Sequence, residues 1–146
     1  MLKLKVLKGL FEHHLGIVFV VLLTFSSYSY SQWIVYTNDE EITIYVDSST
    51  IKRDGNFVDF WVIHNFKLPS VEVFGSKVTS TKGRTRYDCK NELQHTLFVT
   101  AYDGEKGTGR VLVVQNYINE KPSWSPIIPD SPNMIIFKRL CSKKSS

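Results

Sequence analysis

Cys89 and Cys141 have the widest choice of chemistry in this chain, which holds no other cysteine. Cys89 lies within the charged run TRYDCKNELQ at residues 85–94, and Cys141 lies close to the end of the sequence. A cysteine can act as a nucleophile, bind a metal or form half of a disulfide. Each of these roles predicts a different kind of protein.

The other residues of the chain favour a disulfide over its two alternatives. A zinc site needs about four ligands, and after residue 31 only His64 and His95 could join the cysteines, at no recognised spacing. A catalytic cysteine needs a nearby base. His95 would lie about 20 Å from Cys89 on one continuous strand. We therefore expect a disulfide and no metal or other cofactor, with a metal ligand and a nucleophile as the weaker interpretations.

Basic residues are concentrated in residues 67–90, where Glu72 and Asp88 are the only acidic residues. They could form a patch that binds an acidic partner, such as a sulfated glycan, a lipopolysaccharide phosphate or an acidic protein. The simpler interpretation is a solvated strand face with ordinary surface charges, and it is the favoured one. The candidate binding patch consists of Lys77, Lys82, Arg84, Arg86 and Lys90.

Residues alternate between the two faces of a strand, which separates the charges around Cys89 from its sulfur. Arg84, Arg86 and Asp88 would share one face, while Tyr87 and Cys89 point the other way. Any binding function of this stretch would then belong to the charged residues. The cysteine would face the core.

Aromatic and histidine residues give fewer signs of a site. Trp33, Trp61 and Trp124 could line a groove, but aromatic rings in a small β domain are expected to fill the core. Trp124 is the exception, because it lies in a proline-rich loop and could make an aromatic contact with a ligand. His64 is expected to be structural. Since no catalytic triad, metal-binding helix motif or phosphate loop is present, the sequence does not predict an enzyme.

The first 31 residues have the order of a secretory signal peptide: lysines, then the apolar run 15–25, then small residues. We expect cleavage before Gln32, because Ser29 and Ser31 supply the small residues three and one before the bond. Ser27 and Ser29 also fit this pattern, so cleavage two residues earlier is the alternative. No cysteine lies near either bond, so we expect no lipid anchor and no permanent membrane anchor after cleavage. The protein is expected to be exported to the periplasm, the cell surface or the medium. With a net charge of +4, nucleic acid is not an expected partner.

Short apolar runs separated by turn residues predict a mainly β (α+β) fold. Asp54 and Gly55 mark a hairpin, and the following run 57–64 is apolar on both faces, as in a central strand. Polar breaks are expected at 67–70 and 81–83. The result is an antiparallel sheet of about six strands, which are expected at 33–37, 42–47, 57–64, from about 85, 93–102 and 110–117.

The chain ends in a predicted helix at 131–141, after a proline-rich segment. Ser131 can cap this helix and Pro132 suits its first turn. Cys141 follows the apolar stripe of the helix, so a bond to Cys89 would tether the helix to the sheet. We expect a single domain at 32–141 followed by a polar tail at 142–146.

Several short segments occur in an order that resembles the surface-adhesin protein E family of exported proteobacterial proteins. They are WIVY at 33–36, YVDSSTIKRDGNFVDFWV at 45–62, RYDC at 86–89, AYDG at 101–104, GTGRV at 107–111, WSPIIPDSP at 124–132 and the helical Cys141. The resemblance covers essentially all of the chain after residue 31.

The resemblance implies a six-stranded antiparallel sheet with a C-terminal helix tethered by a Cys89–Cys141 disulfide. It also implies a Gram-negative source and an adhesin that binds host extracellular-matrix proteins such as vitronectin and laminin. The family's adhesin is a lipoprotein, whereas this sequence lacks the lipidation cysteine. We therefore predict a non-enzymatic binding module for a matrix protein or an acidic glycan. The alternative is an envelope-accessory or structural protein with an envelope protein as its partner.

Overall fold

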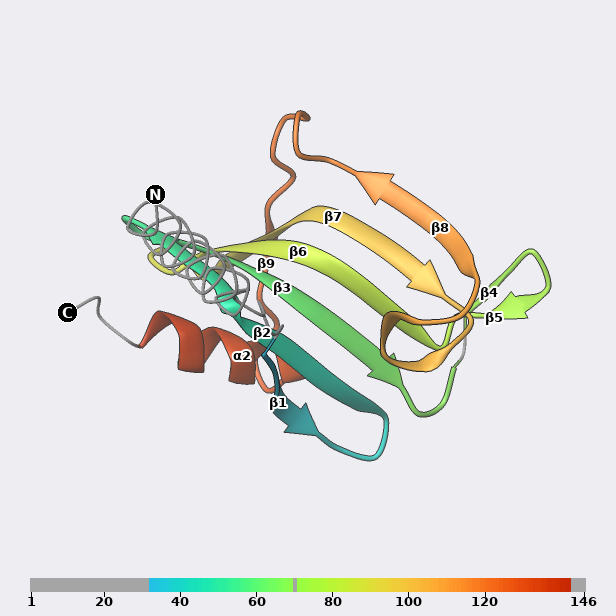
Figure 1. Cartoon of the computed structure of the whole chain (residues 1–146). Helices are drawn as coiled ribbons and strands as arrows, with labels where there is room; N and C mark the ends of the chain where they lie inside the picture. Colours follow the sequence, from blue (N-terminus) through green and yellow to red (C-terminus); the bar gives the residue numbers. More distant parts are fainter. Residues whose placement is uncertain (1–31, 70, 143–146) are drawn as a thin grey trace, which may run out of the picture. The chain divides into compact units, whose positions relative to one another are not determined.

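The computed structural model describes residues 32–69 and 71–142 (Figure 1). The predicted signal peptide and nearly all of the predicted tail lie outside these residues. The elements are β1 (Trp33–Asn38), β2 (Ile42–Asp54), β3 (Phe57–Phe66), β4 (Glu72–Val73), β5 (Ser76–Lys77), β6 (Ser80–Asp88), β7 (Leu93–Tyr102), the 3-10 turn η1 (Glu105–Gly107), β8 (Val111–Asn116), β9 (Ser125–Pro126) and α2 (Pro132–Cys141).

The main sheet has the strand order β1-β2-β3-β6-β7-β8, and every pair in it is antiparallel. The short β9 pairs with the first two residues of β7, and β4 and β5 form a separate small hairpin. Figure 1 shows α2 and the β4–β5 hairpin at opposite ends of this sheet. The predicted six-stranded antiparallel sheet with one C-terminal helix is confirmed.

Strand β3 lies in the interior of the sheet, as its apolar character predicted. Val58, Phe60, Val62 and Ile63 are all nearly inaccessible, and β3 is paired with β2 on one side and with β6 on the other. A strand that is buried on both faces needs apolar residues at consecutive positions. This is why the run shows no strict alternation.

Helix α2 covers one face of the sheet, which we call the helix face. The Ser131 hydroxyl accepts a hydrogen bond from the Met134 N–H at 3.3 Å, and Pro132 opens the first turn. Ile136, Phe137 and Leu140 are buried against Phe60 and other apolar residues of β2 and β3. A helix of ten residues is marginal by itself, so this packing supplies most of its stability.

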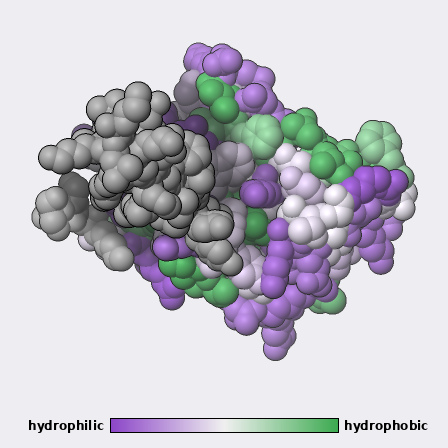
Figure 2. All heavy atoms as spheres, in the orientation of Figure 1, coloured by the Kyte–Doolittle hydropathy of each residue, from purple (hydrophilic) through white to green (hydrophobic). Residues whose placement is uncertain are grey.

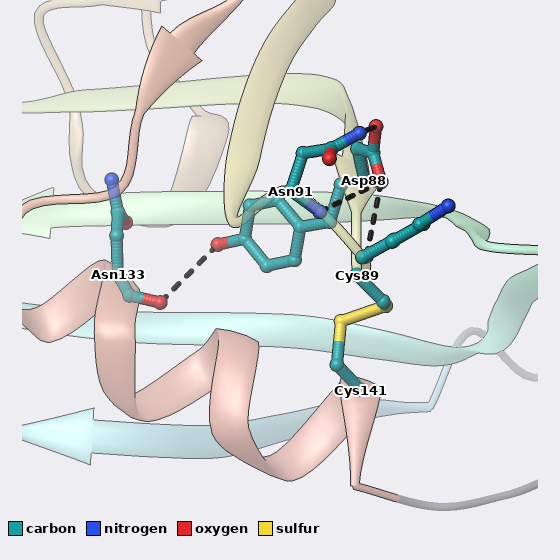
Figure 3. The surroundings of a disulfide bond; sticks show 7 residues. Asp88, Cys89, Asn91, Asn133 and Cys141 are labelled. Carbon is teal, nitrogen blue, oxygen red and sulfur yellow. Dashed lines mark hydrogen bonds between the residues drawn. A yellow bond between two sulfur atoms is a disulfide. The ribbon is translucent and has the colours of Figure 1, made fainter.

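The disulfide joins Cys89, just after β6, to Cys141 at the end of α2, and the Cα atoms are 5.4 Å apart. Figure 3 shows the disulfide at the last turn of α2. At the first turn of the helix, the Tyr87 hydroxyl is directed to the Asn133 carbonyl oxygen, 3.5 Å away. Tyr87 is 1% exposed and packs between the rings of Phe60 and Phe137. The predicted disulfide is confirmed, and it ties the helix to the centre of the sheet.

Two predicted strand limits were wrong. Strand β2 runs on to Asp54 through a register shift between Asp47 and Lys52, since irregular residues inside a long strand can be absorbed as a bulge. Residues 81–83 are not a break, because β6 begins at Ser80. Gly83 is needed there, because a Cβ atom at this position would clash with the Phe98 carbonyl oxygen of β7.

In the part of the chain that the structure describes, no helix is both long enough and apolar enough to span a membrane. Within the same residues, no group of three or more His, Cys, Asp or Glu side chains is placed to hold a metal ion.

Candidate binding face

The sheet surface opposite the helix face carries three basic side chains from one strand. Tyr87 of β6 points toward α2, so the alternating residues Lys82, Arg84 and Arg86 point the other way. In the register of the sheet, these three residues lie opposite Ile63, Trp61 and Asp59 of β3. On its other side, Arg84 lies opposite Phe98 of β7. We call this surface the cationic face. It consists of Lys82, Arg84 and Arg86 together with their neighbours Asp59, Trp61, Phe98, Trp33, Phe57 and Trp124.

Asp59 links the two arginines of the cationic face. Arg86 donates from Nε to Asp59 Oδ1 at 2.5 Å and from Nη2 to Oδ2 at 2.8 Å. Arg84 donates from Nη2 to Asp59 Oδ2 at 2.7 Å. The Asp59 side chain is only 8% exposed, against 33% for Arg84 and 41% for Arg86. The carboxylate therefore sits beneath the two guanidinium groups and holds them in place.

Asp59 and Arg86 keep their charges over the physiological pH range. Burial would raise the pKa of Asp59, but the hydrogen bonds and positive charges of Arg86 and Arg84 outweigh it and hold that pKa below its ordinary value. The hydrogen bond to Asp59 in turn raises the pKa of Arg86. Asp59 and Arg86 are consequently ionised near neutral pH.

Aromatic rings flank the cations at the centre of the cationic face. The rings of Trp61 and Phe98 are 5.8 Å apart, on either side of Arg84 in the register. Lys82 Nζ lies 5.2 Å from the centre of the Trp33 ring, within the range of a cation–π interaction. These rings restrict the basic side chains without neutralising them.

A second aromatic group continues the cationic face toward the proline-rich segment. The Arg86 guanidinium lies 5.9 Å from the centre of the Phe57 ring. Phe57 stacks on Trp124 at 5.8 Å, and Trp124 lies 5.6 Å from the ring of His95. Trp124 is half-buried. The structure therefore brings Arg86 and Trp124, which are far apart in sequence, onto one surface.

Two other residues of the predicted patch lie elsewhere. Lys77 is on the β4–β5 hairpin and Lys90 is in the turn after β6. They lie beyond opposite ends of β6, which spans roughly 26 Å. The five predicted residues thus do not form one compact patch, and Lys82, Arg84 and Arg86 are the three that the structure brings together.

Asp88 does not contribute a free charge to the cationic face. Its carboxylate accepts hydrogen bonds from the N–H groups of Lys90 and Asn91 and from the Asn91 side chain (Figure 3). The residue is 7% exposed. Burial would raise the pKa of Asp88, but these hydrogen bonds hold it below its ordinary value. Asp88 shapes the turn between β6 and β7.

Comparison with known proteins agrees with this architecture. A family model described as surface-adhesin protein E matches residues 33–142. The chain belongs to the surface-adhesin protein E family. The predicted family is thus confirmed, and membership supports an adhesin-like binding module.

Solved structures of Haemophilus influenzae protein E share the fold of this family member. Crystal form II matches with a TM-score of 0.53 and 18% identity, over 77% of this chain and 89% of that chain. Protein E from non-typeable Haemophilus influenzae matches with a TM-score of 0.50 and 18% identity, over 80% and 79%. No curated protein sequence matches the chain.

The expectation that the tryptophans fill the core was wrong. The buried aromatic residues of the core are Phe60, Tyr87 and Phe137, whereas Trp33 and Trp61 lie half-buried on the cationic face. Both faces of β3 are apolar in the sequence, so the sequence does not show which face meets the helix. Register with Arg84 is the signal that assigns Trp61 to the cationic face.

His64 lies on the helix face, apart from the cationic face. Its Nδ1 is 3.5 Å from the Thr81 hydroxyl, and it shares a small polar pocket with Thr85, Gln94 and Asn133. Burial lowers the pKa of His64, although a hydrogen bond with Asn133 acts in the opposite direction. This matches the structural role expected from the sequence.

Proposed function

We propose that this protein is an exported, non-enzymatic binding module that contacts an acidic macromolecule through its cationic face. The observation that carries the proposal is the row of Lys82, Arg84 and Arg86 between aromatic rings on one surface of the sheet. The ligand class is a sulfated glycan or an acidic segment of an extracellular-matrix protein.

The chemistry of the cationic face favours an anionic ligand. Asp59 is the one acidic residue among those that define the cationic face, and its side chain is only 8% exposed beneath the arginines. Asp47 and Asp88 are buried, and Asp54 acts on Arg86 from the end of β2. The partly exposed charges at the centre of the face are therefore those of Lys82, Arg84 and Arg86. Guanidinium groups bind sulfate and carboxylate with a planar pair of donors. Asp59 already orients both guanidinium groups, which lowers the entropy lost when a ligand binds.

A long polyanion suits this surface better than a small anion. Each cation is partly exposed and therefore contributes little by itself in salt solution. Several simultaneous contacts along β6 would add to a useful affinity. Half-buried Trp33, Trp61 and Trp124 offer apolar area beside the charges, which fits the hydrophobic parts of a sugar ring or a peptide.

The decisive experiment measures binding of residues 32–146 to immobilised heparin and to a matrix protein over a range of salt concentrations. In the test variant, Lys82, Arg84 and Arg86 are changed to Gln. Asp59 is changed to Asn in the same variant, so that no buried carboxylate is left without a cation. We expect binding to weaken at least tenfold and its salt dependence to become shallower.

A matched control removes three lysines outside the cationic face: Lys77, Lys90 and Lys121, each changed to Gln. This control should bind nearly as the parent does. Equal binding by the test variant would exclude the cationic face as the site. Co-purification of a single envelope protein, with no binding to heparin or matrix protein, would instead favour the envelope-accessory role.

Export is part of the same proposal. We propose that residues 1–31 are removed as a signal peptide, which leaves the domain at 32–141 with a short polar tail at 142–146. N-terminal sequencing of the protein recovered from the periplasm and the medium tests this. A start at Gln32 is the expected result, and the protease accessibility of intact cells distinguishes the periplasm from the surface.

A further inference from the structure

An apolar groove lies on the same side of the sheet as α2 but at the far end, beside the β4–β5 hairpin. Its volume is about 320 Å³, and Thr81 and Gln115 are the only polar residues among the nine that line it. Val71, Val73 and Val78 form its hairpin side. The sheet side is formed by residues of β3, β6, β7 and β8. Among the residues that the structure describes, no charged side chain lines the groove.

The β8 strand, which forms one wall of this groove, is an edge strand. No strand among the described residues pairs with its outer side. Natural edge strands are commonly protected by charges or proline, but β8 reads VLVVQN and contains neither. Val111 is 50% exposed and Val114 is 59% exposed. Figure 2 shows hydrophobic residues along the rim of the molecule where Figure 1 places β8.

The register fixes which groups of β8 face outward. Tyr117 donates its N–H to the Leu97 carbonyl, and Gln115 and Val113 lie opposite Val99 and Ala101 of β7. Because hydrogen-bonded pairs alternate along an antiparallel ladder, Val113 and Gln115 direct their backbone groups to β7. Val114 and Asn116 therefore direct theirs to the outer edge.

The side chains of β8 alternate in the same way. Val113 and Gln115 point into the groove, so Val114 lies on the opposite face of the strand. A strand added antiparallel to β8 would hydrogen-bond at the residue opposite Val114. Its residues opposite Val113 and Gln115 would project their side chains over the groove. These would be non-hydrogen-bonded pairs, in which the two side chains lie closer together.

We propose that the outer edge of β8 and the adjacent apolar groove together bind an extended, uncharged segment of a partner protein by strand addition. The partner segment pairs antiparallel with β8, as all neighbouring strands of the sheet do. Its backbone bonds to Val114 and Asn116, and an apolar side chain enters the groove. The groove lies on the opposite side of the sheet from Lys82, Arg84 and Arg86, and the inference does not depend on the proposed function.

The chemistry of the groove selects this occupant. An uncharged lining gives no counter-ion for an acidic or basic side chain, and burying one would be costly. A volume of about 320 Å³ accommodates one or two apolar side chains. A free apolar molecule would fill the groove but leave the outward backbone groups of β8 to water. An extended peptide can both fill the groove with an apolar side chain and hydrogen-bond to the outward backbone groups of β8.

The test uses a terminally blocked, fluorescent heptapeptide of alternating Thr and Val with Leu at its centre. The peptide, Thr-Val-Thr-Leu-Thr-Val-Thr, should bind the mature protein. Its Thr residues can form backbone hydrogen bonds with the edge of β8 while the Leu side chain enters the groove. N-methylation of the Thr residues should weaken binding at least tenfold. N-methylation of the Leu and Val residues should have little effect, because their N–H groups point away from β8.

The protein variant Val114→Pro tests the same pairing from the other side. Proline is tolerated in an edge strand where the N–H faces solvent, yet it removes the donor that the added strand needs. We expect at least a tenfold loss of peptide binding with unchanged heparin binding and thermal unfolding. Val114→Thr should bind as the parent does, and Val113→Phe, which fills the groove, should weaken binding.

Four results would overturn the inference, three of them from the binding experiments. These three are absence of peptide binding, equal binding of the two N-methylated peptides, and full binding by Val114→Pro. A dimer in sedimentation experiments that Val114→Pro abolishes would also overturn it, since the occupant would then be a second copy of this chain.

Discussion

The two faces of the sheet are built from alternate residues of the same strands and yet differ in almost every physical respect. On β6, Tyr87 is 1% exposed and contacts α2, while the Arg86 side chain, one position earlier, is 41% exposed and points to the opposite side. The helix face is held by apolar packing and a disulfide. The cationic face is held by ion pairs and ring contacts.

This contrast separates stability from recognition. Apolar burial on the helix face contributes about 25 cal/mol per Å², whereas a partly exposed ion pair contributes about 1 kcal/mol or less. Charged groups that stay half exposed remain available to a ligand. Changes on the helix face should therefore alter folding, and changes on the cationic face should alter binding first.

The largest expected effect is removal of the disulfide. The bond closes a loop of 52 residues, and in the chain-entropy model a loop of that size is worth about 4 kcal/mol. The variant Cys89→Ser with Cys141→Ser should lose roughly that much unfolding free energy in urea, and α2 should lose protection from amide exchange first. Reduction of the parent protein should reproduce the change. An unchanged unfolding midpoint would contradict the role of the bond.

A change at Asp59 tests whether a residue of the cationic face affects binding alone or also contributes to folding stability. Asp59→Ala removes three hydrogen bonds to Arg84 and Arg86 and leaves their positive charges side by side. We expect a loss of about 1–2 kcal/mol, limited by the exposure of the guanidinium groups. Asp59→Asn should cost less because it keeps an acceptor. If Asp59→Ala weakened heparin binding without lowering stability, Asp59 would act by orienting the arginines alone.

The fold could be predicted from the sequence largely because its signals are local. Asp54-Gly55 marks a hairpin, and the capped, amphipathic segment after Ser131 marks the helix. Gly83 shows the limit of such reasoning. A glycine among polar residues usually indicates a break in a strand. Here the glycine is required because the β7 backbone comes too close for a Cβ atom. That approach exists only once the strands are paired.

The candidate site was harder to predict, because it depends on register between strands. Alternation placed Arg84 and Arg86 on one side, as predicted. It could not reveal that Asp59, 25 residues before Arg84, lies beneath them. Nor could it join Trp124 to Arg86, because that contact runs through Phe57 of another strand. Composition alone placed the distant Lys77 and Lys90 in the same group.

A smaller effect is expected at the helix cap, which belongs to the helix face but is made of polar groups. The Ser131 hydroxyl accepts from the Met134 N–H, and loss of such a cap costs about 1 kcal/mol. Ser131→Ala should lower the unfolding free energy by this amount, whereas Ser131→Asp should restore it. Equal stability of Ser131→Ala and the parent would show that packing and the disulfide alone position α2.

The smallest effect at neutral pH is expected from His64, a half-buried titratable group of the helix face. Because burial lowers the pKa of His64 in the folded protein, its contribution to stability is complete above the ordinary pKa of about 6.5. As the pH falls below that value, the unfolded chain binds a proton before the folded one does, so the stability decreases. Asp59 also loses its stabilising charge on acidification, but only below its ordinary pKa of about 3.9. Urea unfolding between about pH 7.5 and 5 should therefore report the contribution of His64, and His64→Gln should flatten that part of the profile. An identical slope in His64→Gln would assign the pH dependence to other groups and leave the helix face without a titrating residue in this range.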